Sequence, residues 1–509
     1  MSQSGAAMRS GESKWVLGID LGTTNTAAVA LARGSDESVS ILHGRDRLVM
    51  PSVMSFKNPN LPLVGWSAKD MLLTDPLTTI YGWKRFVGRS ERSEYVQRHR
   101  HRFPFRIHAD PNGTLGAVVE HRVIAFEHIA ALVLDQVRLQ ATAALHEDVR
   151  DAVISVPAHF TAAQRHAILE AGRRARLNVL RLVNEPTAAA LAFGIDQHLD
   201  THVLVFDLGG GTFDATLLEL VDNIFDVRAT RGEGFLGGID FDRAIMKRCL
   251  DLIEHRYKVD LSEEPVVSQR ILNAAESAKI HLSSVEETRI HVPTLGTNRQ
   301  GQWFDLDYTL TRREFEALTA PLVERTVGIV EEMMAGHPLD HVIATGGQSR
   351  MPLVLRRIGE SLGLQPMTHL NPDTCVAQGA ALVAKSEDRF DGAVLLDVLS
   401  VPIGVVFPGG RTEMVFDAGC SLPARITLPV ERPTRTPDLA VGVWQGPSLT
   451  SSERHVLGIL QMSSHLFEGS APCSIELSLS EDLRVDAKFV SGSRREALRL
   501  EQVQTTARR

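Results

Sequence analysis

Cysteine is scarce in this chain, and the cysteines that are present lie far apart. They are Cys249, Cys375, Cys420 and Cys473, and no two of them form a C-x-x-C pair. Disulfide-stabilised secreted domains and cysteine zinc modules both depend on closely spaced pairs, so the pattern excludes both classes. We expect free thiols in a reducing compartment.

Long apolar runs and an excess of positive charge are also lacking. No segment approaches the roughly 20 apolar residues of a membrane-spanning helix, and the polar stretch before Trp15 has no apolar signal core. The formal net charge of -8 disfavours nucleic acid as a partner of the whole surface. The sequence therefore predicts a cytoplasmic protein with no membrane and no nucleic-acid partner.

Two segments far apart in the chain have nearly the same pattern. GIDLGTTNTAAVAL begins at Gly18 and VFDLGGGTFDATLL begins at Val205, and each predicts a strand, a Gly/Thr turn and a returning strand. Backbone N–H groups in such turns can approach an anion closely. Asp20 and Asp207 end the first strands, where carboxylates can bind the water shell of Mg²⁺. The two hairpins predict a nucleotide phosphate chain held between duplicated lobes.

Helical patterns follow each hairpin. NEPTAAALAFG predicts a helix with Glu185 in its first turn, where the helix dipole favours an anion. ILNAAESAKIHLSS predicts a second helix, on which Glu276, Lys279 and Ser283 share one face. From these residues alone, the dipole explains Glu185 and solvent exposure explains the polar face equally well.

The composition changes near Asp391. The run DGAVLLDV is too short to be an independent element. Beyond it we expect about seven strands separated by turn signals, among them VGVWQG, HVLGILQM, SIELSLS and LRVDAKF. That spacing predicts an all-β sandwich.

Taken together, these blocks resemble the seventy-kilodalton heat-shock chaperone family, the DnaK-type chaperones, within the actin and sugar-kinase superfamily. The resemblance is carried in family order by GIDLGTTN, WKRFVGR, AVISVPAHF, RLVNEPTAAALAFG, FDLGGGTFD, FLGGIDFD, AESAKIHLSS, TGGQSRMP, LNPDTCVAQGAA and VLLDV. It implies an α/β fold with an actin-like ATPase domain of two lobes and four subdomains over residues 14–388. The resemblance also implies an interdomain linker over 389–400. After it comes a β-sandwich substrate-binding domain over 401–509 with no helical lid.

The resemblance also implies a nucleotide site. Asp20 and Asp207 match carboxylates that hold Mg²⁺ through water. Lys84, Glu185 and Thr212 match residues around the reacting phosphate and the attacking water, so these five are the candidate catalytic residues. The residues that match the phosphate loops and the adenosine pocket are Gly22, Thr23, Thr24, Asn25, Gly209, Gly210, Gly211, Thr212, Gly237, Gly238, Glu276, Lys279, Ser283, Gly346, Gly347, Arg350 and Asp373. The implied cofactors are ATP or ADP with Mg²⁺, and K⁺ is a further candidate ion.

Coupling between nucleotide and peptide is a further implication of the resemblance. Pro157 and Arg165 match a proline and an arginine that relay nucleotide state, and Leu395, Leu396 and Asp397 match the linker. Taken alone, Pro157 is a strand terminator and Arg165 a surface cation, and these alternatives stay open. The implied partners are unfolded or extended polypeptides, a J-domain co-chaperone and a nucleotide exchange factor.

We therefore expect an ATP-dependent chaperone in which ATP binding and slow hydrolysis are coupled to peptide binding. The C-terminal region matches more loosely, and the chain stops at Arg509 where the family adds a lid, so we expect fast peptide exchange and weak affinity. Alternatives are a nucleotide-switched interaction protein with a degenerate peptide-binding domain, a sugar-kinase-like phosphotransferase and an actin-like filament protein. The basic segment from Lys84 to Arg106 is either a solvated face or a docking surface.

Overall fold

A computed structural model describes most of the chain. The described residues are 13–43, 47–194, 200–221, 224–386, 394–396, 398–399, 401–432, 438–451, 454–468, 470–480 and 483–501. None of the helices in these segments is both long enough and apolar enough to cross a bilayer. All four cysteines are free thiols, as expected.

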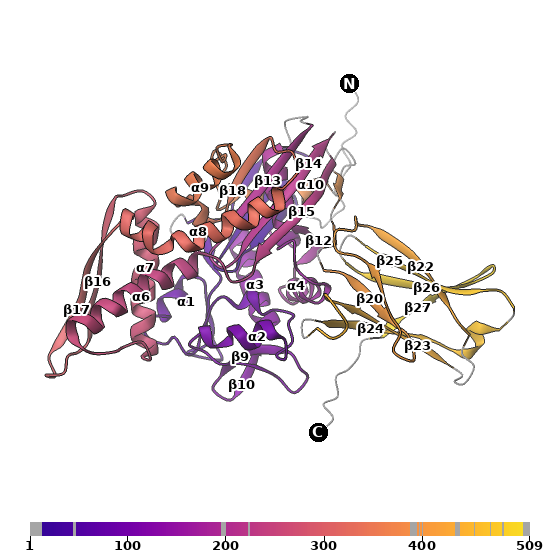
Figure 1. Cartoon of the computed structure of the whole chain (residues 1–509), viewed down its shortest axis with the longest axis horizontal. Coiled ribbons are helices and arrows are strands. Elements are labelled where there is room, and N and C mark those ends of the chain that lie inside the picture. The colour runs from indigo at the N-terminus through magenta and orange to yellow at the C-terminus, as the bar shows by residue number, and fades with distance from the viewer. Residues whose placement is uncertain are drawn as a thin grey trace.

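Two sheets that share a common arrangement of four strands form the centre of the N-terminal part (Figure 1). The first has the order β12-β11-β1-β2-β3, with β4 also on β2, and the second has the order β18-β13-β14-β15-β19. In each, an antiparallel hairpin lies beside a parallel strand, as β1 with β2 and β11, and as β13 with β14 and β18. The bounds are β1 (Trp15–Leu21), β2 (Asn25–Ala32), β3 (Ser38–Ser40), β4 (Met50–Pro51), β11 (Asp151–Val156), β12 (Asn178–Asn184), β13 (Thr201–Leu208), β14 (Phe213–Val221), β15 (Ile224–Glu233), β18 (His341–Thr345) and β19 (Val394–Leu396). The duplication predicted from the two hairpins is therefore present in the fold.

Alternation along β1 explains how helices cover both faces of the first sheet. Leu17 and Ile19 pack in one core with α3 (Phe126–Leu145) and α4 (Ala162–Arg174), whereas Val16 packs in a second core with α5 (Glu185–Gly194) and α10 (Cys375–Ser386). Val203 and Val205 of β13 belong to that second core as well. The α5 and α10 helices thus lie between the two sheets and join the lobes.

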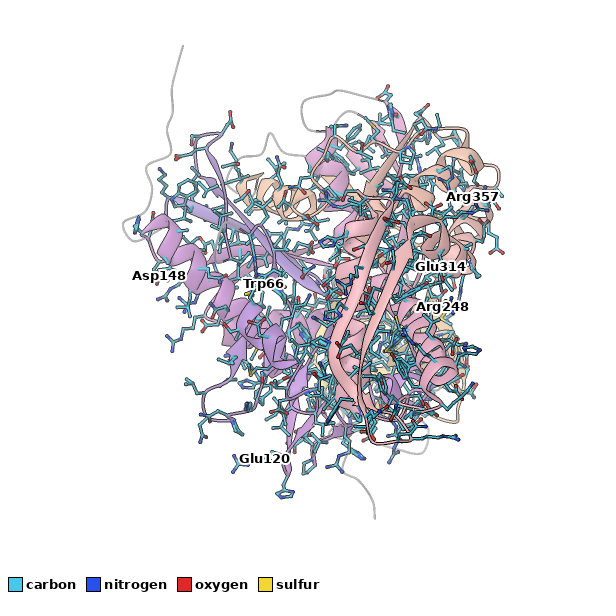
Figure 2. The ribbon with its side chains drawn as sticks, turned by 90° about the vertical axis from the view of Figure 1, so that its left-hand side faces the viewer. Trp66, Glu120, Asp148, Arg248, Glu314 and Arg357 are labelled. Carbon is cyan, nitrogen blue, oxygen red and sulfur yellow. The ribbon has the colours of Figure 1, made fainter. Side chains whose placement is uncertain are left out.

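The outer face of the second sheet packs against α6 (Gly238–Tyr257), α8 (Arg312–Met334) and α9 (Pro352–Leu362). Small elements extend both lobes toward the solvent. In the first lobe these are β5 (Met54–Ser55), β6 (Leu63–Val64), α1 (Trp66–Met71), β7 (Thr79–Ile80), α2 (Glu94–His99), β8 (Ile107–Ala109), β9 (Leu115–Val119) and β10 (Arg122–Ala125). In the second lobe they are α7 (Pro265–Leu282), β16 (Glu287–Thr297) and β17 (Trp303–Thr311). Figure 2 shows the β16–β17 hairpin of the second lobe facing the viewer, and Trp66 lies on the first-lobe side of the molecule.

The C-terminal part is a β-sandwich (Figure 1). Its sheets have the orders β21-β20-β23-β24-β28 and β22-β25-β26-β27, and every pair within them is antiparallel. The bounds are β20 (Ile403–Val406), β21 (Thr412–Phe416), β22 (Ala424–Val430), β23 (Leu439–Gln445), β24 (His455–Met462), β25 (Cys473–Leu479), β26 (Val485–Ser491), β27 (Arg494–Leu498) and β28 (Leu500–Glu501). The predicted β-sandwich is confirmed, but its described residues contain nine strands where about seven were expected, because short strands such as β28 carry no alternating pattern of their own.

The sandwich contacts the first lobe at the start of α4, which lies beside β20 and β24 in Figure 1. The Ala162 backbone N–H donates to Oε1 of Gln445 at 2.8 Å, and Nε2 of Gln445 donates to the carbonyl of Val401 at 3.1 Å. Ala162 also packs against the apolar core of the sandwich. The buried side chain of Gln445 therefore hydrogen-bonds both to α4 and to Val401, in the segment that leads into the sandwich.

Candidate functional site

A cavity between the lobes brings most of the predicted site residues together. Those that line it are Asp20, Gly22, Thr23, Thr24, Asn25, Glu185, Asp207, Gly209, Gly210, Gly211, Thr212, Gly238, Glu276, Lys279, Ser283, Gly346, Gly347, Arg350 and Asp373. Lys84 lies behind Glu185, and Gly237 lies against Gly211. Residues from both hairpins, α7 and the segment after β18 thus converge on one space.

The two turns approach each other closely at the phosphate side of the cavity. A Cβ on Gly210 would overlap the side chain of Thr24, so only glycine allows the second turn to reach the first. The Thr24 hydroxyl is buried and has no hydrogen-bond partner among the described residues. A buried hydroxyl without a partner is costly, and a phosphate oxygen would satisfy it.

Carboxylates crowd the floor of the cavity. Burial, reinforced by the negative charge of Glu185, raises the pKa of Asp20 to about 7, although Lys84 and a hydrogen bond from Ser155 oppose the shift. The pKa of Asp207 is raised well above its usual value by burial and by the charges of Glu185, Asp214 and Asp20. Such raised values show a site with more negative charge than its own cations neutralise. A bound cation would remove that imbalance.

Lys84 and Glu185 form a buried ion pair at this floor. Lys84 lies in a short 3-10 helix (Trp83–Arg85) and Glu185 begins α5, and Nζ donates to Oε1 at 2.7 Å. The two side chains are 2% and 10% exposed, so neither charge could be buried at low cost without the other. The helix dipole is therefore not sufficient on its own to explain Glu185.

The opposite side of the cavity is built from α7 and the turn after β18. Glu276, Lys279 and Ser283 face the cavity together, as their spacing predicted. Lys279 donates to the Gly238 carbonyl at 3.0 Å and pairs with Asp242 at 2.9 Å. Burial raises the pKa of Asp242 to about 6 in spite of this pair.

Arg350, in the 3-10 helix after β18 (Gly347–Arg350), closes the same wall through an ion pair of 2.7 Å with Asp373. Gly346 and Gly347 supply a side-chain-free surface at that junction. This wall thus combines an open backbone surface with the charged side chains of α7.

Comparison with known proteins agrees with this geometry. The profile of the Hsp70 protein family matches residues 16–464, which include parts of both lobes and of the sandwich. The chain belongs to the Hsp70 family. Curated relatives include the chaperone protein DnaK of Deinococcus deserti, 35% identical over 503 residues that make up 96% of this chain and 79% of the relative. The DnaK chaperone of Thermus thermophilus is 40% identical over 418 residues, 80% of this chain and 67% of the relative.

Members of the Hsp70 family are ATP-hydrolysing chaperones, so this chain is an ATPase and a DnaK-type chaperone that binds ATP and unfolded polypeptide. The match extends into the sandwich, which the phosphotransferase and filament alternatives leave without a role.

Several residues of the Hsp70 site were missed by sequence reasoning. Trp66 lines the cavity from α1, and its indole N–H donates to the Val49 carbonyl at 3.2 Å. Asp214 lies directly opposite Asp207 in the register of β13 and β14, although the motif FDLGGGTFD displays both acids. The presence of both acids in this motif was the available signal. That they lie opposite each other is shown only by the strand register.

Lys69 was also missed, and it connects the lobes across the mouth of the cavity. Its Nζ lies 2.7 Å from a carboxylate oxygen of Glu276, and the two side chains are 21% and 24% exposed. We expect Lys69→Ala to accelerate ADP release several-fold, because a partly buried lobe-to-lobe ion pair resists opening. Stopped-flow displacement of a fluorescent ADP measures the rate, and Lys247→Ala, on the exposed face of α6, is the control. Equal release rates for Lys69→Ala and wild type would contradict this role.

The residues expected to couple the domains lie in both lobes. Pro157 ends β11, and Arg165 is buried in α4, where its Nη2 donates to Oδ1 of Asn184. The surface-cation alternative for Arg165 is therefore wrong. Leu395 and Leu396 belong to β19, which pairs with β15, whereas Asp397 lies outside the described residues. The described part of the linker run forms a short strand at the edge of the second sheet, although the run was expected to be too short for an independent element.

The basic segment is largely paired within the molecule. Arg98 pairs with Glu94, Arg100 with Glu91 at 3.4 Å, and Arg102 with Asp240 at 3.3 Å. The Arg85 side chain is fully buried and donates to the Gly211 carbonyl. These contacts favour the solvated-face and structural explanation over a docking surface.

Proposed function

We propose that the cavity holds ATP with Mg²⁺ and that hydrolysis there controls the β-sandwich. The observation that carries this proposal is the buried Lys84–Glu185 pair beside Asp20 and Asp207. Glu276, Lys279, Ser283, Gly346, Gly347, Arg350 and Asp373 are the proposed adenosine contacts, and the two turns with Gly237 and Gly238 are the proposed phosphate contacts.

The donor set fits Mg²⁺ in a particular way. The described residues contain no group of three or more His, Cys, Asp or Glu side chains arranged to hold a metal ion directly. Mg²⁺ keeps several of its waters, so Asp20 and Asp207 would bind those waters rather than the ion. When bound, Mg²⁺ would neutralise charge on the phosphates. K⁺ remains a further proposed ion.

The chain's own residues then provide positioning. Lys84 neutralises charge near the phosphate, and Glu185 fixes the Lys84 ammonium group in place. The Gly209 N–H closes the second turn by donating to the Thr212 carbonyl at 3.0 Å. The N–H groups of Gly210 and Gly211 and the hydroxyl of Thr212 would orient the transferred group. Phosphoryl transfer to water needs mainly such positioning and charge stabilisation.

Coupling to the sandwich would follow a chain of direct contacts. Gln445 binds the first amide of α4, and Arg165 of the same helix binds Asn184. Asn184 precedes Glu185, which holds Lys84. We propose that Pro157, at the end of β11, and the linker residues Leu395, Leu396 and Asp397 keep these parts in register.

Single-turnover ATP hydrolysis with and without an extended apolar peptide tests the coupling. Wild type should hydrolyse ATP faster with peptide, and Gln445→Ala should lower that ratio toward one, because α4 loses its bond to the sandwich. Gln461→Ala is the matched control, since Gln461 is an exposed glutamine on the neighbouring strand β24. Undiminished stimulation in Gln445→Ala would contradict the path, and absence of stimulation in wild type would contradict the coupling itself.

Further parts of the function are proposed on the family relationship. The ATPase domain would span residues 14–388, the linker 389–400 and the substrate-binding sandwich 401–509. A J-domain co-chaperone and a nucleotide exchange factor are proposed partners, extended peptide segments are proposed clients, and the cytoplasm is the proposed location.

A further inference from the structure

His159 and Asp214 meet across the cleft between the lobes. His159 lies between β11 and α4 of the first lobe, whereas Asp214 is the second residue of β14 in the second lobe. Nδ1 of His159 lies 2.8 Å from Oδ1 of Asp214. The contact therefore links the two lobes beside the acidic floor of the nucleotide cavity.

Asp214 is in an unfavourable place for a carboxylate. It is directly opposite Asp207 across β13 and β14, whereas in the first hairpin the residue opposite Asp20 is Ala27. Acids opposite each other in a strand pair repel, and the charge of Asp214 contributes to the raised pKa of Asp207. The Asp214 side chain is only 5% exposed, so water does little to relieve the repulsion. A hydrogen-bond donor would stabilise a buried carboxylate at this position.

A glycine on the neighbouring strand leaves space for the Asp214 carboxylate. Gly232 lies opposite Asp214 on β15, and a Cβ there would be 2.5 Å from Oδ1. His159 reaches the same oxygen from the other lobe. Since a carboxylate oxygen accepts, Nδ1 of His159 carries the proton, whether the imidazole is neutral or charged.

His159 is not simply part of a core. Its side chain is 30% exposed, and its ring meets Phe160 edge-on with centroids 6.0 Å apart. Nζ of Lys84 lies 5.6 Å from the centre of the Phe160 ring. The imidazole thus lies at the solvent side of the group of residues that surround the proposed reaction centre.

We infer that His159 is a positioning residue for ATP hydrolysis. Its Nδ1–H orients the Asp214 carboxylate beside Asp207, and it can do so only when the lobes are closed, because the two residues belong to different lobes. Asp214 then presents its other oxygen to the water network of the site. The inference rests on the proposed nucleotide site and adds His159, to which no role was assigned above.

Two substitutions of His159 distinguish the loss of the Nδ1–H donor from the loss of the imidazole ring. His159→Leu removes the N–H, whereas His159→Asn retains an N–H at the same number of bonds from Cβ. We expect His159→Leu to lower the single-turnover hydrolysis rate roughly 10-fold, the effect of losing one hydrogen bond to a charged group. Its ATP dissociation constant should change by less than about two-fold, and His159→Asn should hydrolyse within about three-fold of wild type.

A double-substitution cycle shows whether His159 acts through Asp214. In the Asp214→Asn background, His159→Leu should lower the rate by less than about two-fold further, because its partner is already absent. A full 10-fold loss in that background, a wild-type rate in His159→Leu, or equal loss in His159→Asn and His159→Leu would each overturn the inference. A wild type that fails to bind ATP would instead overturn the proposed nucleotide site, so the two failures are distinguishable. Thermal unfolding of each variant measures its folding separately.

Discussion

Lys84→Ala is expected to lower single-turnover ATP hydrolysis by about 100-fold or more, because it removes the cation held beside the acidic floor. The substitution also leaves Glu185 buried without its partner, and a buried unpaired charge is strongly destabilising. We therefore expect a lower melting temperature as well as slow hydrolysis, with the rate measured by chemical quench and the melting temperature by calorimetry.

A second substitution separates these two effects. In Lys84→Ala/Glu185→Ala neither member of the buried ion pair is left without its partner, so the melting temperature should return toward the wild-type value while hydrolysis remains slow. Recovery of hydrolysis in the double variant would show that Lys84 acts only by stabilising the fold, and our assignment of the lysine would be wrong.

Gly379→Ala is expected to have the largest effect on stability. Gly379 is buried in α10, and a Cβ there would overlap the carbonyl oxygen of Ala188 in α5. Because the neighbour is backbone, the helices must separate, and we expect a loss of about 3 kcal/mol or more in unfolding free energy. The displacement of α5 should also slow hydrolysis, since Glu185 begins that helix.

Gly328→Ala is the matched control for this prediction. Gly328 also lies in a helix, α8, but a Cβ there would meet nothing within 4 Å. It should leave hydrolysis unchanged and stabilise the protein by about 0.5–1 kcal/mol through helix propensity. Urea unfolding monitored by circular dichroism compares both variants, and similar effects from the two would show that the α5–α10 approach does not limit stability.

Local features of the fold were predictable because their causes lie within a few residues. Thr161 caps α4, with its hydroxyl accepting from the Gln164 amide, as the sequence pattern indicated. The stripe of Glu276, Lys279 and Ser283 faces the cavity because helix geometry alone places these residues together. The turns of the two hairpins follow from their glycines in the same way.

What sequence reasoning missed depends on contacts between distant segments. That Asp207 and Asp214 lie opposite each other follows only from the strand register. That His159 contacts Asp214 follows only from the packing of one lobe against the other. Trp66 lines the cavity from an element of six residues, too short for a periodic signal. Trp66 and His159 display no local pattern that distinguishes them from ordinary surface and core residues.

The strand β19 has a consequence for how linker docking can be observed. It pairs with Ile224–Asp226 of β15, whose opposite edge is already bonded to β14. If the linker leaves, the outer edge of β15 exposes backbone N–H and C=O groups without partners, as any edge strand does. Amide hydrogen exchange at Ile224 to Asp226 would therefore report linker release directly, and the freed edge would be open to any other extended segment that can take its place.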